Sequence, residues 1–552
     1  MADDAQKQRL FWGCWLALIT TAFGFISRML LISDWSAEFN LDPAQAGRLA
    51  GIGIWPFALS IIVFSLFIDR IGYKTAMVVS FLGYMAWSGM AVGAYFVSAG
   101  GQGDPDLGFK LLYWGSLILG LSNGTVEAYI NPVVATMFNK EKTKWLNILH
   151  AGWPGGLVLG GLITIGLGML PESVVGPDGV PWWIKIAIIA PPALIFFLML
   201  APLKFPVQER VASGVSYREM LAEFGVLGAA IVGFLVTLQL MDFFSDGGVN
   251  PLTVTAKYAF IGIGVAIVVT FGLYTQSLGN KLLFVLALIM MPLATTELGT
   301  DAWISTLMEG IADDAGFHPA LVLIYTSAIM MVLRFFAGSI VHVVSPIGLL
   351  IIGSLLAIGG LYSLSFTSTA VMIFVAATLY AIGKSFFWPT MLGVAAEQTP
   401  KGGALTLNAL GGIGMLAVGT LGLPYIGTLK AAKEIEAVAQ RDDLLAVIPA
   451  MSADGVAAVL DDKRVYEVIP YQAIDEEKLA AALVGAPEGE ADALSDEIAA
   501  VRTASNQGAL ASMCIFPAVM LAAYALLGLY FKSRGGYQAQ HIGEAVPAGA
   551  EA

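Results

Sequence analysis

Long apolar stretches recur along the whole chain and limit what it can fold into. Taking about 20 apolar residues per bilayer crossing as the measure, the sequence predicts about fourteen membrane helices. The predicted spans are 10–33, 46–67, 75–98, 109–137, 146–169, 182–202, 222–244, 256–276, 281–307, 319–341, 346–366, 370–395, 403–428 and 509–531. Because a backbone in lipid must satisfy its own hydrogen bonds, the chain is predicted to be an all-α polytopic membrane protein.

The composition agrees with this class and excludes several functions. Hydrophobic residues make up 57% of the chain and charged residues 12%, whereas a soluble domain carries roughly 25% charged residues. Cys14 and Cys514 both lie in apolar segments, so neither a disulfide framework nor a thiolate metal site is predicted. Glycine pairs such as those at 411–414 lie inside apolar helices without a preceding strand, which indicates helix packing rather than nucleotide binding. We expect no enzyme activity, no cofactor, no metal and no nucleic-acid partner.

Basic residues predict how the chain is oriented. Those in the connections on the side of the N-terminus are Lys7, Arg9, Arg70, Lys74, Lys140, Lys142, Lys144, Lys204, Arg210, Arg218, Lys281, Lys401, Lys532 and Arg534. The short connections on the other side hold Lys257. Cytoplasmic loops carry the excess of Lys and Arg. Both termini are therefore predicted to be cytoplasmic, in a plasma (inner) membrane.

One connection is too long for a simple loop. Residues 430–508 carry most of the acidic excess, and the run from Asp475 to Val484 opens with acids as a helix start does. We predict a small, mostly helical external subdomain, with partial disorder as the alternative, and leave a binding partner for it open. The predicted divisions are 1–203, 204–280 with an inserted hairpin, 281–429, the external segment 430–508, the last span 509–531 and a cytoplasmic tail 532–552.

A polar face interrupts the fourth span. Asn123, Glu127 and Asn131 are spaced four residues apart, which stacks them on one side of a helix. A charge near the middle of a membrane helix costs at least a few kcal/mol, so it normally faces a cavity or a partner. Glu127 is therefore the first candidate for a functional residue, with a fixed ion pair to Arg28 as the alternative.

A charged motif between the second and third spans resembles a known family. The sequence Ser65-Leu-Phe-Ile-Asp69-Arg70-Ile-Gly72-Tyr-Lys74 is similar to the Gly-x-Leu-x-Asp-Arg-x-Gly-Arg-Lys signature of the major facilitator superfamily. The resemblance implies that Asp69, Arg70 and Lys74 gate the cytoplasmic side by pairing across two halves.

Further elements resemble the fucose:proton symporter family and related glucose carriers. They are Glu127-x-x-x-Asn131-Pro132, Leu146-Asn147 with His150 and Trp153, Glu297-x-x-x-x-x-Trp303, Arg334-Phe335 and Ser385-x-x-x-Pro389-Thr390. The resemblance implies two six-helix bundles around a central cavity, with the hairpin at 222–276 inserted between them. The implied cavity helices carry Arg28, Glu127, Glu297 and Lys384.

These residues define a predicted site. The candidates for substrate binding are Arg28, Asn123, Glu127, Asn131, Trp303, Lys384, Trp388 and Asn408. Proton coupling is predicted for Glu127, Glu297 and Asp301; the last two repel at a spacing of four residues if both are charged, and Asp301 could instead be solvated. Arg334 is predicted to be a gate or helix-positioning charge, and His150 a capping or packing residue.

The predicted function is secondary active transport by alternating access, with proton-coupled uptake of a sugar or sugar derivative. Arg28 and Lys384 favour an alternative, a porter for organic anions such as sugar acids, since a guanidinium suits a carboxylate. A third alternative, from a different class, is a transport-inactive membrane sensor whose external loop binds a partner. The predicted partners are a small-molecule substrate, a coupling proton and the lipid bilayer.

Overall fold

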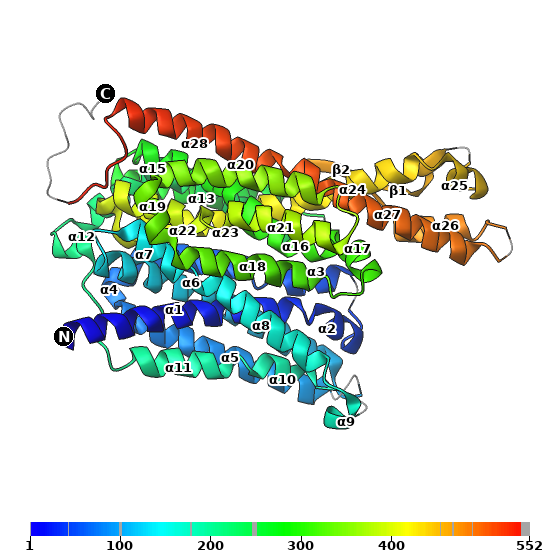
Figure 1. Cartoon of the computed structure of the whole chain (residues 1–552), viewed down its shortest axis with the longest axis horizontal. Coiled ribbons are helices and arrows are strands. Elements are labelled where there is room, and N and C mark those ends of the chain that lie inside the picture. The colour runs from blue at the N-terminus through cyan, green and yellow to red at the C-terminus, as the bar shows by residue number, and fades with distance from the viewer. Residues whose placement is uncertain are drawn as a thin grey trace.

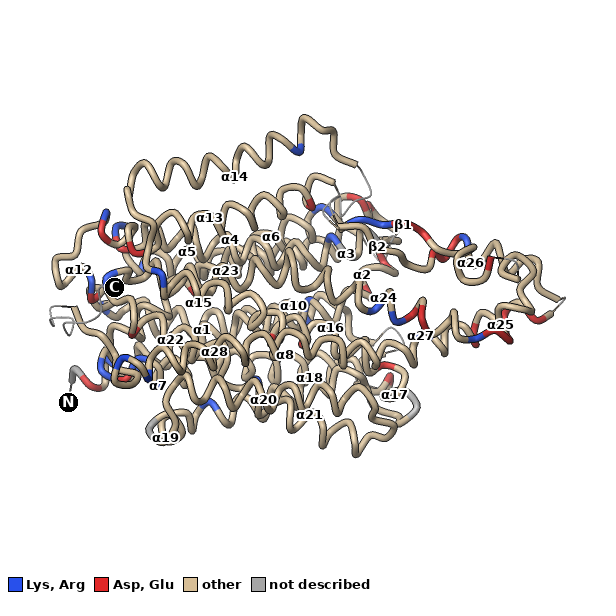
Figure 2. The backbone as a smooth tube through the Cα atoms, turned by 90° about the horizontal axis from the view of Figure 1, so that it is seen from above, with Lys and Arg blue, Asp and Glu red and all other residues tan. Residues whose placement is uncertain are grey.

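The computed structural model describes residues 2–41, 43–98, 102–176, 179–245, 251–452, 454–465, 469–487 and 489–542. A bundle of long, roughly parallel helices forms the body, and a narrower projection extends from one end (Figure 1). The start of helix α1 (Ala2–Met29) and the end of helix α28 (Ile515–Ser533) lie at the opposite end of the bundle, which we call the terminal end. Figure 2 shows many Lys and Arg residues gathered at the terminal end and a mixture of acidic and basic residues along the projection.

The N-terminal half of the bundle is built from the helices before residue 203. They are α1 (Ala2–Met29), α2 (Ile32–Glu38), α3 (Pro43–Gly51), α4 (Trp55–Ile71), α5 (Tyr73–Ser98), α6 (Pro105–Met137), α7 (Lys142–Leu149), α8 (Gly152–Gly168), α9 (Glu172–Val175), α10 (Trp182–Ala187) and α11 (Ala190–Leu200). Several predicted spans are interrupted in the structure. The fifth, for example, is divided into α7 and α8 by a turn at His150 and Ala151.

The C-terminal half is also rich in interrupted helices. Its elements are α15 (Lys281–Ala294), the π-helical turn η2 (Thr295–Gly299), α16 (Thr300–Leu307), α17 (Glu309–Asp314), α18 (Ala320–Phe335), α19 (Ala337–Val343), α20 (Pro346–Leu364), α21 (Ala370–Lys384), α22 (Phe387–Gln398), the 3-10 turn η3 (Pro400–Gly402), α23 (Gly403–Ala417), the π-helical turn η4 (Val418–Gly422), α24 (Leu423–Ala439) and α28 (Ile515–Ser533). The two halves pack along α4 with α23 and along α8 with α18, and their buried apolar side chains form one continuous core.

Twelve helical stretches within the described residues are long and apolar enough to cross a membrane. Two further predicted spans correspond to α18, which has 16 residues, and to α6. The 33-residue α6 carries Asn123, Glu127 and Asn131 at its centre, which lowers its hydropathy. The prediction of an all-α polytopic membrane protein is confirmed for the bundle.

The segment between the halves contains α12 (Glu209–Ala212), α13 (Tyr217–Phe244) and α14 (Val254–Thr275). Helix α13 packs against α23 and α14, and α14 lies along the outer edge of the molecule (Figure 2). At Gly225 the chain of α13 has φ of +59°. A Cβ there would lie 2.2 Å from the backbone nitrogen of Gly279, so glycine is required for the close approach of the segment that enters the C-terminal half.

The projection is formed by residues 430–508 and is joined to the bundle by two continuous helices. Its further elements are α25 (Asp442–Val447), the 3-10 turn η5 (Gly455–Val459), β1 (Leu460–Val465), β2 (Ile469–Ile474), α26 (Glu476–Leu483) and α27 (Ala491–Met513). The predicted helix start is confirmed, since the Asp475 side chain accepts from the Lys478 backbone N–H at 2.9 Å. The antiparallel pair β1 and β2 was not predicted. The charged sequence of β1 lacks the alternation that marks a strand, and the pairing itself holds it extended.

The projection has an apolar core of its own. Side chains from α24, α25, α26 and α27 contribute to it, and Ile448 and Met451 at its centre are fully buried. Helices α24 and α27 pack against each other, and α24 runs without interruption through residues 429 and 430. The projection is therefore a folded continuation of two bundle helices.

Candidate substrate cavity

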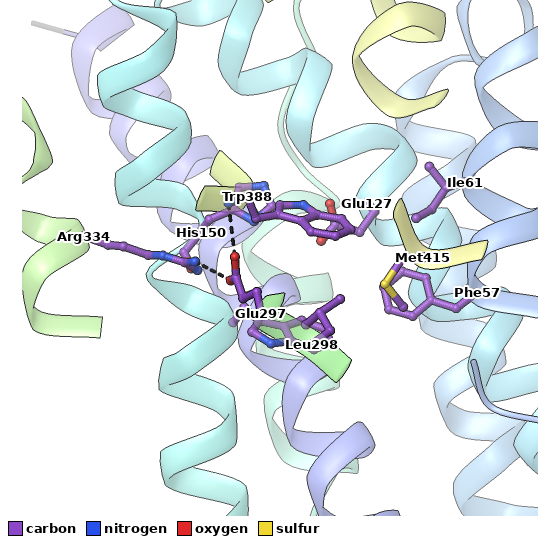
Figure 3. Close-up of a pocket in the computed structure, with 10 residues that line it drawn as sticks. Phe57, Ile61, Glu127, His150, Glu297, Leu298, Arg334, Trp388 and Met415 are labelled. Carbon is purple, nitrogen blue, oxygen red and sulfur yellow. Dashed lines mark hydrogen bonds and ion pairs between the residues drawn. The ribbon is translucent and has the colours of Figure 1, made fainter. Parts of the chain in front are cut away.

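A small cavity lies between the two halves and is lined by residues of both (Figure 3). Its lining combines carboxylates, one arginine, one histidine and apolar or aromatic side chains, a composition typical of a small-molecule site. The lining residues are Phe57, Ile61, Glu127, His150, Trp153, Glu297, Leu298, Arg334, Trp388 and Met415. Of the predicted site residues, the structure brings Glu127, Glu297, Arg334 and Trp388 together here.

Glu127 is the cavity carboxylate without a cationic partner. Its side chain is 5% exposed, and its Oε2 accepts from Asn131 Nδ2 at 2.6 Å. Asn131 Oδ1 in turn contacts His150 Nε2 at 2.9 Å. Within the described residues no Lys or Arg forms a salt bridge with Glu127, and in Figure 3 no dashed line reaches it from the other residues drawn. A neutral amide therefore holds this carboxylate in place.

Arg28 does not form the ion pair with Glu127 that was the alternative. Its guanidinium donates to the carbonyl oxygens of Leu49 at 2.5 Å and Ala50 at 2.8 Å. These carbonyls end α3, where the helix dipole favours a cation. Arg28 thus joins α1 to α3 and does not line the cavity.

Asn123 lies on the predicted polar face but one turn away from the cavity. Its Oδ1 accepts from Tyr84 Oη at 2.9 Å, and Tyr84 also contacts Thr21 Oγ1 at 2.8 Å. This chain of hydrogen bonds ties α6 to α5 and α1. Asn123 therefore has a structural position, while Glu127 and Asn131 continue the same face toward the cavity.

Glu297 forms a buried ion pair with Arg334. Its Oε1 accepts from Arg334 Nη2 at 2.7 Å, and the two side chains are 2% and 1% exposed. Its Oε2 accepts from the backbone N–H of Trp388 at 3.1 Å, which is an unpaired donor at the start of α22. Figure 3 shows both contacts as dashed lines. Because Glu297 lies in the π-helical turn η2, its position depends on a local helix irregularity of the kind found at functional sites.

Asp301 and Lys384 form a second buried ion pair. Their side chains are 7% and 0% exposed, and the ammonium of Lys384 also lies 5.1 Å from the centre of the Tyr380 ring. Glu297 and Asp301 thus have separate cations, which removes the repulsion expected from their spacing. Asp301 is buried rather than solvated, and neither Asp301 nor Lys384 lines the cavity.

Aromatic side chains form the apolar walls of the cavity. Trp153 packs against Phe57, with ring centres 6.3 Å apart, and Trp388 faces the cavity from α22. The buried Nε1 of Trp153 has no hydrogen-bond partner among the described residues, so it is a donor available to a ligand. Trp303, the aromatic residue favoured from the sequence, is partly buried in the core and lies outside this lining.

The predicted gate charges form a different set of contacts from those expected. Asp69 pairs with Arg210 of the segment between the halves at 2.5 Å, and Arg70 lies 4.3 Å from the centre of the Tyr217 ring. These contacts join the N-terminal half to the connecting segment. Lys74 is exposed, and no salt bridge of Lys74 is found within the described ranges.

Polar side chains at the terminal end join the two halves directly. Glu397 Oε1 accepts from the backbone N–H of Thr143 at 2.9 Å and from its hydroxyl at 2.6 Å. Asn147 Nδ2 donates to Thr390 Oγ1 at 3.2 Å. Glu397 Oε2 also accepts from Tyr537 of the tail at 2.7 Å. The terminal end of the cavity is therefore closed by contacts between α7 and α22.

His150, Trp153 and four apolar residues of the lining were not predicted as site residues. His150 was expected to cap or pack, and it does follow the last residue of α7, but its ring contacts Asn131. Its place in the resemblance to the symporter family was the available signal. Phe57, Ile61, Leu298 and Met415 carry no such signal, because an apolar residue in an apolar helix looks the same whether it faces lipid or a cavity. No cluster of three or more His, Cys, Asp or Glu side chains that could hold a metal occurs in the described part of the chain.

Comparison with solved structures finds the same fold at low sequence identity. The human organic anion transporter MFSD10 (TETRAN) aligns with a TM-score of 0.52 and 12% identity, over 94% of this chain and 99% of that one. The proton:xylose symporter XylE from E. coli aligns with a TM-score of 0.52 and 15% identity, over 77% and 89%. FucP, a Major Facilitator Superfamily transporter, aligns in its outward conformation with a TM-score of 0.50 and 14% identity, over 76% of this chain and 92% of that one.

Comparison by sequence adds the family. No curated protein matches the chain, but the family model described as Major Facilitator Superfamily matches residues 14–422. This range includes the charged motif from Ser65 to Lys74 and every residue that lines the cavity. The protein is a membrane protein with several spans, and its chain belongs to the Major Facilitator Superfamily.

Proposed function

We propose that the protein takes up a neutral sugar or sugar derivative together with a proton, by alternating access to the central cavity. The observation that carries the proposal is the environment of Glu127. A buried carboxylate with a cation beside it stays charged, whereas one held by an amide in an apolar cavity can gain and lose a proton as water and substrate come and go. Glu127 is therefore the proton carrier, and it accepts a hydrogen bond from the substrate.

The state of the three candidate cations favours a neutral substrate over an anion. Arg28 donates to two backbone carbonyls, Lys384 pairs with Asp301 and Arg334 pairs with Glu297. An incoming carboxylate would have to break one of these buried interactions, at a cost of several kcal/mol. The unpaired charge at the cavity is instead negative, which disfavours anions.

The shape and chemistry of the cavity also suit a sugar. Trp153 and Trp388 offer aromatic faces to C–H groups, and Glu127 and the free Nε1 of Trp153 offer an acceptor and a donor to hydroxyl groups. Solved neighbours include a xylose symporter as well as an organic anion transporter, so both classes of substrate enter the test.

The basic end of the bundle supports an orientation. The start of α1, the end of α28 and many Lys and Arg residues lie there, and such residues accumulate on the cytoplasmic side. We place the terminal end in the cytoplasm and the projection outside the plasma (inner) membrane. The cavity is then closed toward the cytoplasm in this structure.

The test is transport by purified protein in liposomes that contain a pH-sensitive dye. Neutral monosaccharides and the matching uronic acids are added outside, and sugar-driven proton entry is followed for wild type, Glu127→Gln and Glu38→Gln. Glu38 serves as the control because its carboxylate accepts from Ser98 and Trp182, away from the cavity. We expect a neutral sugar to drive proton entry, Glu38→Gln to keep it and Glu127→Gln to lose it.

Each alternative has its own outcome. Undiminished proton entry in Glu127→Gln would contradict the assignment of the proton to Glu127. Flux with uronic acids but not with neutral sugars would replace the proposal with a carboxylate porter. Binding without flux for every substrate would favour a transport-inactive sensor whose projection contacts a partner.

A further inference from the structure

Three side chains cross between the halves to bind backbone carbonyls of the opposite half. A helix carbonyl normally accepts from the N–H of the residue four positions later, and a proline at that position has no N–H to give. Such a carbonyl needs another donor, because an unpaired polar group inside a membrane protein costs several kcal/mol.

The first of these contacts joins α23 to α6. Asn408 Nδ2 donates to the carbonyl oxygen of Ala128 at 2.8 Å. The residue four positions after Ala128 is Pro132, which lies inside α6. Asn408 therefore supplies from the C-terminal half the hydrogen bond that α6 cannot make for itself.

The second contact joins α18 to the turn between α7 and α8. Arg334 Nη1 donates to the carbonyl oxygen of His150 at 2.7 Å, and Pro154 is four positions later. Arg334 Nε also donates to the carbonyl oxygen of Ser385 in its own half at 2.6 Å. Pro389 follows Ser385 by the same four positions. One guanidinium therefore donates to two turn carbonyls, and four residues after each of them a proline stands in the first turn of the next helix, α8 or α22.

The third contact joins α7 to the end of α22. Lys142 Nζ donates to the carbonyl oxygen of Ala396 at 3.3 Å, and Pro400 follows four positions later. Ala396 lies in the last turn of α22, where carbonyls lack intrahelical donors in any case. The 3-10 turn η3 that follows α22 begins at Pro400. Because proline has no N–H, this residue cannot donate to the carbonyl of Ala396.

Within the described residues, these three are the hydrogen bonds in which a side-chain donor of one half reaches a backbone carbonyl of the other, and all three acceptors precede a proline by four residues. Proline fills 24 of 552 positions, so chance pairing would seldom select such carbonyls three times. The contact of Lys142 lies beside the Thr143–Glu397 contacts that join the halves at the terminal end, and the contact at His150 borders the cavity.

We propose that Pro132, Pro154 and Pro400 are latch residues, each of which leaves a backbone carbonyl open for a donor of the opposite half and so stabilises the state closed at the terminal end. When the halves separate there, water enters and hydrates the released carbonyls. Asn408, Arg334 and Lys142 then lose the carbonyl to which they donate, and no residue of their own helix replaces it. Replacing a latch proline by alanine would return an N–H to the helix, which then competes with the donor of the opposite half.

The inference rests on alternating access in the proposed function but not on the substrate, so it is tested without one. Spin labels are attached through Lys140→Cys and Lys401→Cys, two exposed positions at the terminal end of opposite halves, with Cys14→Ala and Cys514→Ala in the background. Their distance distribution is measured by electron spin resonance in full-length protein in lipid nanodiscs. Pro132→Ala, Pro154→Ala and Pro400→Ala are compared with wild type.

Pro292→Ala is the matched control. Pro292 also lies inside a helix, but the residue whose carbonyl it frees, Leu288, is 44% exposed on the outside of the bundle. We expect each latch variant to raise the ratio of long to short distances about two- to tenfold, the range for one net hydrogen bond, and Pro292→Ala to leave it unchanged. Equal ratios in the latch variants and wild type would overturn the proposal. A wild type that never shows a longer distance, at any pH or lipid composition, would overturn alternating access as well.

A double-mutant cycle separates the latch from a general effect of proline on helix shape. Within the described residues, the side chain of Asn408 makes one hydrogen bond, the one to the carbonyl of Ala128. Pro132→Ala and Asn408→Leu therefore act on the same contact. If the proline acts by freeing the carbonyl for Asn408, the double variant shows no larger shift than Asn408→Leu alone. Full additivity of the two shifts would contradict the mechanism, and the melting temperature of each variant shows that the fold is retained.

Discussion

Two buried carboxylates face the same cavity from opposite halves, and the protein holds them in different ways. Glu297 is bound by the guanidinium of Arg334 at 2.7 Å and by a backbone N–H at 3.1 Å. Glu127 is bound by the amide of Asn131 at 2.6 Å. Both came from the same kind of sequence signal, an acid inside an apolar helix.

The difference separates structural from functional charges. The pair of Glu297 and Arg334 joins η2, α18, α22 and the turn at His150, so it connects these elements mechanically. Glu127 has a neutral neighbour, and its protonation can change without leaving a cation unpaired. The C-terminal half therefore holds its cavity carboxylate in a charged clamp, and under the proposed function the carboxylate of the N-terminal half is the one that carries the proton.

The largest expected effect comes from making the same substitution at both positions. Glu297→Leu leaves Arg334 buried without its counter-ion and should lower the free energy of unfolding by about 3–5 kcal/mol. Glu127→Leu removes one hydrogen bond, donated by the neutral amide of Asn131. It should lower the free energy of unfolding by no more than about 2 kcal/mol. Thermal unfolding of both variants in the same detergent gives the comparison, and equal losses would mean that Glu127 has a hidden structural partner.

The two ion pairs of the C-terminal half should differ from each other. Glu297 accepts from Arg334 and from the backbone N–H of Trp388, whereas Asp301 accepts from Lys384 and its Oδ2 has no partner within the described residues. Asp301→Asn should therefore cost less than Glu297→Gln, about 1–3 kcal/mol, because it disturbs fewer buried hydrogen bonds. Melting temperatures of the two variants between pH 6 and pH 9 test this order, which would be contradicted by a larger loss in Asp301→Asn.

A smaller effect is expected at the aromatic wall. Trp153→Phe keeps the ring but removes the Nε1 donor that lacks a partner, so it should weaken binding of the sugar by about 1 kcal/mol, or roughly fivefold. Trp35→Phe is the control, because the Nε1 of Trp35 is also buried without a partner and lies away from the cavity. Tryptophan fluorescence titration with the transported sugar measures both. An unchanged dissociation constant in Trp153→Phe would remove this donor from the site.

The smallest effect concerns an exposed ion pair of the projection. A hydrogen bond from Arg441 lowers the pKa of Asp443 to about 2, so its contribution to stability is present at neutral pH and is lost as the pH falls through that value. Arg441→Ala should return this pKa toward about 3.9 without a measurable change in melting temperature at pH 7, since exposed pairs are worth little. Carboxyl chemical shifts in a pH titration check the first part. A clear loss of stability at pH 7 would contradict the expectation that exposed ion pairs contribute much less to stability than buried ones.

Prediction from the sequence succeeded where a pattern lies within one helix. The face of Asn123, Glu127 and Asn131 follows from their spacing, and the buried helix α6 carries it as expected. Prediction failed where the interaction partner of a residue lies in another helix. Arg28 looked like a partner for Glu127 because no sequence rule shows that the end of α3 lies beside it. His150 looked like a packing residue because its role depends on the break between α7 and α8.

The sequence by itself determined that this chain crosses a membrane many times, which helices contain ionisable residues, and which carbonyls prolines leave without a donor. The tertiary structure alone decided which cation each carboxylate meets and which carbonyl each donor reaches. The physical reason is distance, because the strength of hydrogen bonds and of charge pairs inside an apolar bundle changes over a few ångströms. These distances are determined by how helices that are hundreds of residues apart in the sequence pack together.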